Sequence, residues 1–211
     1  MADDDFYGSA FGSVYSAYME RPWLARPISR VLWGGDLRPY YAAMGVLGET
    51  REGDTVLDCP CGAGPAFRAI PRGRGLRYVA VDLSPSMLRR AGRRAGALGA
   101  KVECVRAKAE ELPLEAGSAD LFLSFWGLHC YADPAAALAE AARVLRPGGR
   151  LVGSAFVRGT DTLRQRLLVR PGIGGFGNVP TGEEVEAMLG DAGFAARGIE
   201  RHGPMVYFDA S

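Results

Sequence analysis

Short apolar segments alternate with helical patterns along most of the chain, and this alternation restricts the possible folds more than any other feature. Seven segments are predicted strands: 55–59, 78–83, 102–107, 119–125, 150–157, 195–201 and 204–209. Helical patterns lie between them at 85–98, 134–145 and 181–194, and a further helix is expected to begin near Pro65. Such alternation predicts an α/β fold: a doubly wound, mostly parallel seven-stranded sheet with helices on both faces.

Length and charge narrow the possible functions. The chain has 211 residues and a formal net charge of +1, which fits one compact domain without the broad basic surface that nucleic-acid binding requires. No apolar run is long enough to span a bilayer, and the acidic start "MADDDFYGSA" lacks the pattern of a signal peptide. We therefore expect a cytoplasmic protein with no nucleic-acid partner and no membrane contact.

The four cysteines do not have the spacing of a metal site. Cys59 and Cys61 form a C-x-C pair, and Cys104 and Cys130 lie far away in the sequence. We interpret all four as small buried hydrophobic residues and predict no bound metal.

Residues 1–50 are expected to form an N-terminal helical cap on a main domain of residues 51–211. The segment is rich in aromatic residues, and prolines divide it into short helical pieces. Two interpretations remain open, which are packing against the core and a lid over a site. Tyr15 and Tyr18 are candidates for contact with a cofactor or substrate, although packing is the default explanation for each.

The stretch "TVLDCPCGAGPAF", residues 55–67, follows the pattern of a strand and a glycine-rich turn. It differs from the dinucleotide-binding pattern G-x-G-x-x-G, because Phe67 occupies the third glycine's place after Gly62 and Gly64, and Pro60, which has no N–H, comes two residues before them. Asp58 at the strand end would also repel a pyrophosphate at short range. The turn therefore favours a ligand that approaches the backbone closely and carries positive charge.

A second carboxylate, Asp82, is placed at the end of the next predicted strand. In nucleotide-binding folds an acidic residue at that position accepts hydrogen bonds from ribose hydroxyls. The two carboxylates together predict a ligand with a ribose, a positive charge and no phosphate. S-adenosylmethionine (SAM) meets all three conditions.

Four segments in order resemble the class I, Rossmann-like, SAM-dependent methyltransferases: "VLDCPCGAG", "VAVDLSPSML", "AKAEELPLEAGSADLFLSF" and "ARVLRPGGRLV". They cover roughly residues 50–155, and the chain is most similar to small-molecule methyltransferases that carry an N-terminal helical cap. The resemblance implies SAM as cofactor, S-adenosylhomocysteine as product and a small-molecule substrate.

The resemblance also implies roles for individual residues. Asp58 would hold the ammonium group of SAM directly or through water, Asp82 its ribose, and the backbone of Ala109 its adenine. The other residues that it places near the cofactor or in the methyl-transfer cavity are Gly62, Gly64, Leu83, Met87, Glu110, Phe125 and Trp126. The chain departs from the family pattern at Pro60, where glycine is usual, and at Lys108, where an acidic residue usually accepts a hydrogen bond from the adenine amino group.

Methyl transfer needs alignment in a dry cavity, and a general base where the accepting atom carries a proton. His129 follows the fourth predicted strand, and its ordinary pKa suits a base near neutrality. A histidine that packs under the loop is an equally good explanation. We expect methyl transfer to a small, partly apolar acceptor. The alternative is a protein of the same fold that uses bound SAM without methyl transfer, as a cyclase or a regulatory binder.

Overall fold

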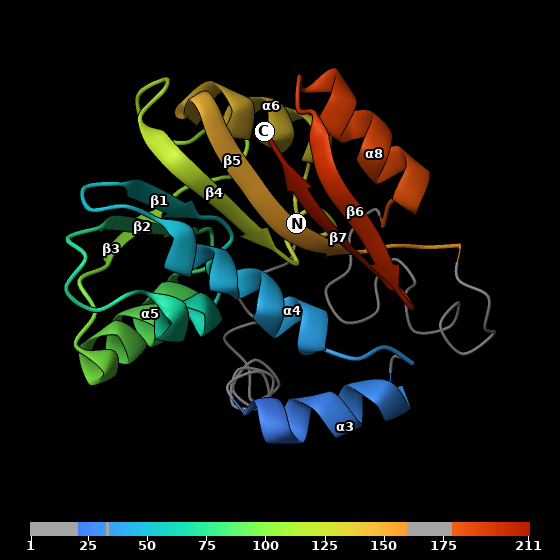
Figure 1. The fold of residues 1–211 in the computed structure, drawn as a ribbon, viewed down its shortest axis with the longest axis horizontal. Coiled ribbons are helices and arrows are strands. Elements are labelled where there is room, and N and C mark those ends of the chain that lie inside the picture. The colour runs from blue at the N-terminus through green and yellow to red at the C-terminus, as the bar shows by residue number, and fades with distance from the viewer. Residues whose placement is uncertain (1–20, 33, 160–178) are drawn as a thin grey trace.

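The computed structural model describes residues 21–32, 34–159 and 179–211, and it contains one seven-stranded sheet of order β3-β2-β1-β4-β5-β7-β6 (Figure 1). The four neighbouring pairs from β3 to β5 are parallel, and β5–β7 and β7–β6 are antiparallel. The predicted α/β fold is confirmed. The strands are β1 Thr55–Asp58, β2 Arg77–Asp82, β3 Glu103–Arg106, β4 Ala119–Phe125, β5 Leu145–Phe156, β6 Ala196–His202 and β7 Met205–Ala210.

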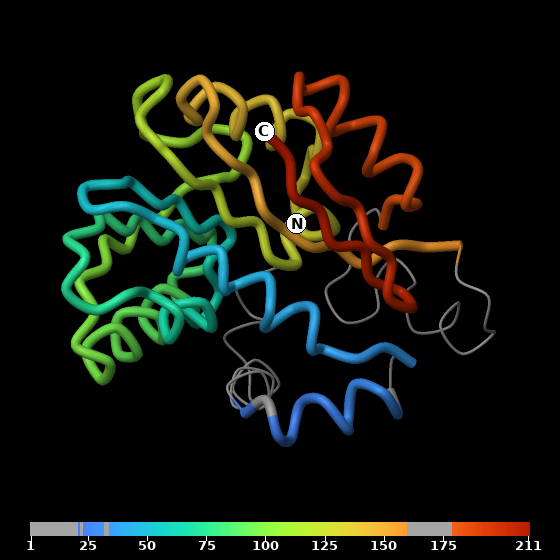
Figure 2. Tube along the Cα trace, viewed as in Figure 1, coloured from blue at the N-terminus to red at the C-terminus, as the bar shows by residue number. Residues whose placement is uncertain are grey.

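Helices cover both faces of this sheet. One core cluster joins residues of α4, the 3-10 helices η1 and η2, and α5 to one face, and a second joins α6 and α8 to the other. Figure 2 shows the C-terminal hairpin of β6 and β7 beside β5. The helical elements are α3 Pro22–Leu32, α4 Arg38–Ala43, η1 Met44–Glu49, η2 Pro65–Ala69, α5 Pro85–Leu98, α6 Pro134–Val144 and α8 Gly182–Asp191.

Strand order reverses at β1, which pairs with β2 on one side and β4 on the other. In an open α/β sheet this reversal opens a crevice at the carboxyl ends of the strands. The backbone N–H of Cys59 donates to the carbonyl of Leu123 at 2.9 Å, so the turn after β1 stays joined to β4. The carboxyl ends of β1, β2 and β4 are therefore the place to look for a site.

Side-chain caps fix where the main helices begin. The Ser84 hydroxyl accepts from the N–H of Met87 at 3.3 Å, with Pro85 at the first helical position. Thr181 and Glu184 form a reciprocal capping box at the start of α8, so Thr181 caps this helix.

Three predicted boundaries are wrong. The fifth strand begins at Leu145 rather than at residue 150, because Pro147 disfavours helical backbone in the residue before it and Leu145 pairs with Ala119. The helix expected near Pro65 is only the short η2, since Ile70 is extended before Pro71. α8 ends at Asp191 rather than near residue 194, and Gly193 has a left-handed φ of 87°.

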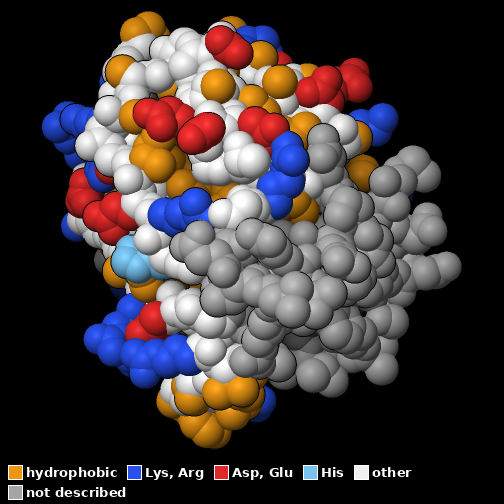
Figure 3. Space-filling view, turned by 90° about the vertical axis from the view of Figure 1, so that its right-hand side faces the viewer, with side chains coloured by type: hydrophobic (Ala, Val, Ile, Leu, Met, Phe, Trp, Pro, Cys, Tyr) orange, Lys and Arg blue, Asp and Glu red, His pale blue; other side chains and the backbone are white. Residues whose placement is uncertain are grey.

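The described part of the N-terminal segment contributes to the core. Tyr40, Met44 and Leu47 are almost fully buried in the same cluster as residues of β1 and β4. α3 is the outermost element at the end of the molecule toward which β4 points (Figure 1). Figure 3 shows hydrophobic side chains gathered at this end of the molecule, with basic side chains beside them. Tyr15 and Tyr18 lie outside the described residues.

Among the residues that the structure describes, none of the helices is both long enough and apolar enough to cross a bilayer.

Candidate functional site

The carboxyl ends of β1 and β2 bring Asp58, Asp82 and the glycine turn together. One carboxylate oxygen of Asp82 accepts from the N–H of Gly62 at 2.8 Å, and the other accepts from the N–H of Ser84 at 2.9 Å. Asp82 therefore joins the turn after β1 to the start of α5. These two bonds hold its carboxylate in one orientation at the carboxyl end of β2.

Asp58 is a buried carboxyl group whose protonation responds to its surroundings. Its side chain is 2% exposed, and Oδ2 accepts a hydrogen bond from the Tyr78 hydroxyl at 2.8 Å. Burial raises the pKa of Asp58 to about 7, with a smaller contribution from the charge of Asp82, and the Tyr78 hydrogen bond opposes that rise. A nearby cation would favour the charged form, so the position suits the ammonium group of a ligand.

The turn itself depends on glycine. Gly62 and Gly64 have φ values of 52° and 76°, which only glycine adopts at low cost. A Cβ on Gly64 would lie 2.4 Å from the ring of Phe67. A Cβ on Gly62 would meet no atom within 4 Å, so open space adjoins the backbone there. This space and the two carboxylates fit SAM, whose amino-acid portion needs close approach to a backbone turn.

Tyr131, which was not among the residues predicted from the sequence, supports the turn from the other side. Its hydroxyl donates to the Cys59 carbonyl at 2.6 Å and lies 3.0 Å from the Ser124 hydroxyl. Gly127 makes room for this contact, since a Cβ there would approach both hydroxyls to 2.5 Å. The proximity of Gly127 and Tyr131 to the end of β4 was the available signal. The peptide bond between Cys59 and Pro60 is cis.

The residues expected on the adenine side lie on two neighbouring segments. Leu83 follows Asp82 directly and is 48% exposed, whereas Met87 and Ala109 are buried. Lys108 is exposed. One oxygen of Glu110 accepts from the N–H groups of Ala132 and Asp133 at 2.9 and 3.1 Å, so this carboxylate holds the loop that leads into α6.

Aromatic side chains meet at the carboxyl end of β4. Trp126 has a φ of 58°, a left-handed value that is uncommon for a bulky residue. Its backbone N–H donates to the Ser154 carbonyl at 2.7 Å. The ring centroid of Trp126 lies 4.9 Å from that of Tyr40 and 5.1 Å from that of Phe156. Phe125 joins the group through an edge contact with Tyr40 at 5.7 Å. Backbone strain of this kind is typical of functional sites.

His129 does not have the pKa that the sequence predicts. Its side chain is 4% exposed, and burial lowers its pKa to about 3, so the expectation of a near-neutral value is wrong. Nδ1 accepts from the N–H of Phe156 at 3.4 Å, and the two rings form an edge contact. These contacts support the packing interpretation, and His129 lies next to the aromatic group as a neutral side chain.

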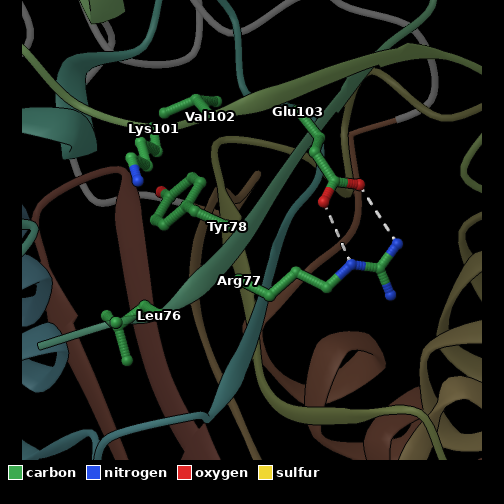
Figure 4. A pocket seen from close by; sticks show the side chains of 7 residues that line it. Leu76, Arg77, Tyr78, Lys101, Val102 and Glu103 are labelled. Carbon is green, nitrogen blue, oxygen red and sulfur yellow. Dashed lines mark hydrogen bonds and ion pairs between the residues drawn. The ribbon is translucent and has the colours of Figure 1, made fainter.

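A hollow at the amino ends of β2 and β3 lies on the opposite edge of the sheet from Asp82 (Figure 4). Arg77 and Glu103 form two hydrogen bonds of 3.1 Å along its side. The carboxyl ends of the strands lie elsewhere, and Tyr78, which lines this hollow, contacts Asp58 through its hydroxyl. Its remaining lining residues are Gly75, Leu76, Tyr78, Lys101 and Val102.

The cysteines are partly as expected. Cys59 and Cys61 are buried, which confirms their interpretation as small hydrophobic residues. Cys130 is only partly buried. Cys104 is exposed on β3, so that interpretation is wrong there, because β3 is an edge strand with three exposed residues.

Comparisons with known proteins agree with this geometry. Residues 57–153 match the family described as "Methyltransferase domain". The chain is 34% identical to the demethylmenaquinone methyltransferase of Thermus thermophilus over 193 residues, which cover 81% of this chain and 87% of that protein. It is 42% identical over 120 residues to an uncharacterised 37.1 kDa protein in transposon TN4556 of Streptomyces fradiae, and the match spans 54% of this chain but only 34% of that relative.

Solved structures share the fold at low sequence identity. A geranyl diphosphate methyltransferase in complex with GPP and sinefungin has a TM-score of 0.70 and 19% identity, covering 83% of this chain and 78% of that one. The [4+2]-cyclase SpnF has a TM-score of 0.66 and 20% identity, with 80% of each chain covered. The 34% identity to the Thermus relative over most of both chains, together with the matched methyltransferase domain, shows that the chain belongs to the class I SAM-dependent methyltransferases.

Proposed function

We propose that the protein transfers the methyl group of SAM to a small, partly apolar acceptor. The observation that supports this most directly is the aromatic group of Tyr40, Phe125, Trp126 and Phe156 at the end of β4, held in part by the left-handed backbone of Trp126. These rings lie on the face of the sheet that also carries Asp58. An apolar acceptor would therefore lie beside the cofactor.

The cofactor would be held by residues that follow the carboxyl ends of β1, β2 and β3. Asp58 would bind the ammonium group, Asp82 would accept from the ribose hydroxyls, and Gly62 would admit the methionine portion to the backbone. Leu83 and Met87 would contact the adenine, and the N–H of Ala109 would donate to it. When bound, SAM would supply a methyl group on a positively charged sulfur. The accepting atom would attack the methyl carbon from the side opposite the sulfur, which leaves as the thioether.

Alignment and exclusion of water are the contributions we assign to the aromatic group. The four rings pack with centroids 4.9–5.7 Å apart and are almost fully buried, so we propose that they form the apolar wall against which a flat or prenyl-like group would be oriented. His129 is neutral near pH 7 and accepts from the N–H of Phe156, so we assign it a positioning role for this group. Proximity and orientation alone can supply about 7–11 kcal/mol toward such a reaction.

The names of two similar proteins indicate the kind of acceptor to test first. One relative is named as a demethylmenaquinone methyltransferase. One solved neighbour is described as a geranyl diphosphate methyltransferase in complex with GPP and sinefungin. Both compounds combine a polar group with an apolar hydrocarbon. We propose an acceptor of this chemical class for the present chain.

The test is incubation of the purified protein with SAM and a panel of demethylated quinols and prenyl diphosphates. We expect S-adenosylhomocysteine to accumulate together with a product heavier by one methylene group. If S-adenosylhomocysteine forms with none of the panel while polar amines or nucleosides are methylated, the proposed acceptor class is wrong.

A second function is a cyclase or a regulatory binder, and the shared fold with SpnF is the observation that favours it. A cyclase would convert its substrate to an isomer of the same mass without forming S-adenosylhomocysteine. Mass spectrometry of the reaction therefore separates the two functions in one measurement.

A further inference from the structure

The exposed side of α3 carries an apolar strip. Trp23 and Val31 are 73% and 63% exposed, and Pro27 between them is also exposed. Residues four apart lie along one side of a helix, so these three form a line, which the half-buried Leu24 and Ile28 widen. We call these five residues the α3 strip. Exposed apolar groups of this kind on a helix mark interaction surfaces.

The opposite side of α3 anchors the helix, so the α3 strip faces outward. Ala25 and Ser29 are fully buried there. The Ser29 hydroxyl lies 2.9 Å from the carbonyl oxygens of Arg26 and Gly35, which joins α3 to the turn before α4. A helix that packs one side against the protein and exposes apolar side chains on the other has a second surface that can bind a partner.

Basic side chains border the α3 strip. Residues 21–43 contain four arginines and one acidic residue, Asp36. Arg30 and Arg38 contact the Asp36 carboxylate at 2.6 and 2.9 Å, and Arg26 lies 3.5 Å from it. One carboxylate thus gathers three arginines beside the strip, and the segment keeps an excess of three positive charges.

We propose that α3 docks on an anionic lipid bilayer, with the α3 strip in the interface and the arginines near the lipid phosphates. A tryptophan with aliphatic neighbours and basic flanks is the pattern of a helix that lies in the plane of a membrane surface. Charge decides between partners: a second copy would bring two basic flanks together, whereas anionic headgroups complement them.

The position of α3 agrees with such docking. It is the outermost element at the end of the molecule toward which β4 points (Figure 1). Figure 3 shows hydrophobic and basic side chains together at this end. The expectation of no membrane contact rested on the lack of a spanning segment, which has no bearing on a helix that lies on a surface. Docking would bring the crevice end of the fold near apolar molecules held in the bilayer.

The experiment is co-sedimentation with vesicles of phosphatidylcholine alone and of phosphatidylcholine with phosphatidylglycerol. We expect the full chain to bind the anionic vesicles, and binding to fall as salt is raised. The double variant W23S/V31S should bind about tenfold or more weakly, because each substitution removes an apolar side chain that would be buried in the bilayer interface. R21Q/R30Q should weaken binding to anionic vesicles and leave any residual binding to neutral ones unchanged.

The matched control is L98S, which removes a partly exposed leucine from α5 on another part of the surface. It should bind as the unaltered chain does. Circular dichroism and thermal melting are measured for every variant, to show that each one folds. The proposal is overturned if the unaltered chain stays in the supernatant, if W23S/V31S binds normally, or if that variant only converts a dimer to a monomer. None of these readouts depends on methyl transfer, so they stand apart from the proposed function.

Discussion

The Tyr78 hydroxyl donates to Oδ2 of Asp58 over 2.8 Å, in a place where both side chains are almost fully buried. Tyr78 lies near the start of β2 and Asp58 at the end of β1, and the neighbouring Phe67 packs edge-on against the tyrosine ring at 5.4 Å. The hydrogen bond favours the charged carboxylate, while burial and Asp82 favour the neutral acid. The balance leaves the pKa of Asp58 at about 7, within the working range of an enzyme.

Binding of S-adenosylhomocysteine should therefore depend on pH. Its ammonium group pairs only with the ionised form of Asp58, so below pH 7 affinity should fall by up to about tenfold per pH unit. Tyr78→Phe removes a bond to the carboxylate and should move the midpoint up by about one pH unit. Calorimetry from pH 5.5 to 8.5 measures both effects, and Tyr207→Phe is the matched control. A flat profile for the unaltered chain contradicts the assignment of Asp58.

Asp58→Asn should change stability in a pH-dependent way. In the folded chain the pKa of Asp58 is raised to about 7, above its ordinary 3.8, so the folded state binds more protons between these values. The contribution of Asp58 to stability therefore falls as pH rises from about 4 to about 7. An amide at this position does not titrate and has no such loss, so the variant should gain melting temperature relative to the unaltered chain at pH 8 more than at pH 5. An equal difference at both pH values would show that Asp58 titrates normally.

Asp82→Asn should weaken binding of S-adenosylhomocysteine by about 1–3 kcal/mol. Both oxygens of Asp82 accept from backbone N–H groups, and an amide would turn one donor toward another donor. The turn at Gly62 would then lose its anchor together with the ribose contact. Calorimetry on folded protein measures the loss, and Glu103→Gln in the distant hollow serves as the control. Unchanged affinity would remove Asp82 from the site.

Trp126→Gly should be more stable than Trp126→Ala. Both variants lose the ring from the aromatic group, but the backbone at residue 126 has a φ of 58°, which glycine adopts freely and alanine does not. We expect a difference of about 1 kcal/mol in the free energy of unfolding, measured with urea. The opposite order would show that the left-handed backbone follows from the ring and is not imposed by the end of β4.

His129→Asn should leave the pH profile of turnover unchanged between pH 6 and 8, because His129 is already neutral there with a pKa of about 3. Its effect should appear in stability instead. Burial of a neutral histidine stabilises the fold fully above its ordinary pKa of 6.5, and this contribution falls as pH decreases toward 3. Acid unfolding should therefore begin at lower pH in the variant. Loss of a basic limb near pH 6–7 would restore His129 as a general base.

The parts of the site that follow from local sequence could be predicted. The strand-end carboxylates and the glycine turn lie within single short segments, and the caps at Ser84 and Thr181 depend on side chains next to the helices that they start. The order of apolar and helical segments was likewise enough for the fold class, because few topologies fit it.

What could not be predicted depends on contacts between distant segments. Tyr78 reaches Asp58, and Tyr131 reaches Cys59, only because the sheet places their segments side by side. The pKa of His129 follows from burial that no single segment reveals. The extension of β5 back to Leu145 depends on pairing with Ala119, which is 26 residues earlier in the chain.

Lys108→Asp should tighten SAM binding by about 0.5–1.5 kcal/mol, the net value of one added hydrogen bond. The adenine amino group is a donor, and the lysine ammonium is only a donor, so Lys108 cannot hold it. The Lys108 side chain is exposed, and the neighbouring Glu110 uses one oxygen for Ala132 and Asp133. A carboxylate at position 108 would therefore give the adenine amino group an acceptor. Calorimetry at fixed salt measures the change, with Lys101→Asp as a control for the reversed charge. Weaker binding in a folded Lys108→Asp protein would mean that Lys108 itself contacts the ligand and that the adenine lies elsewhere.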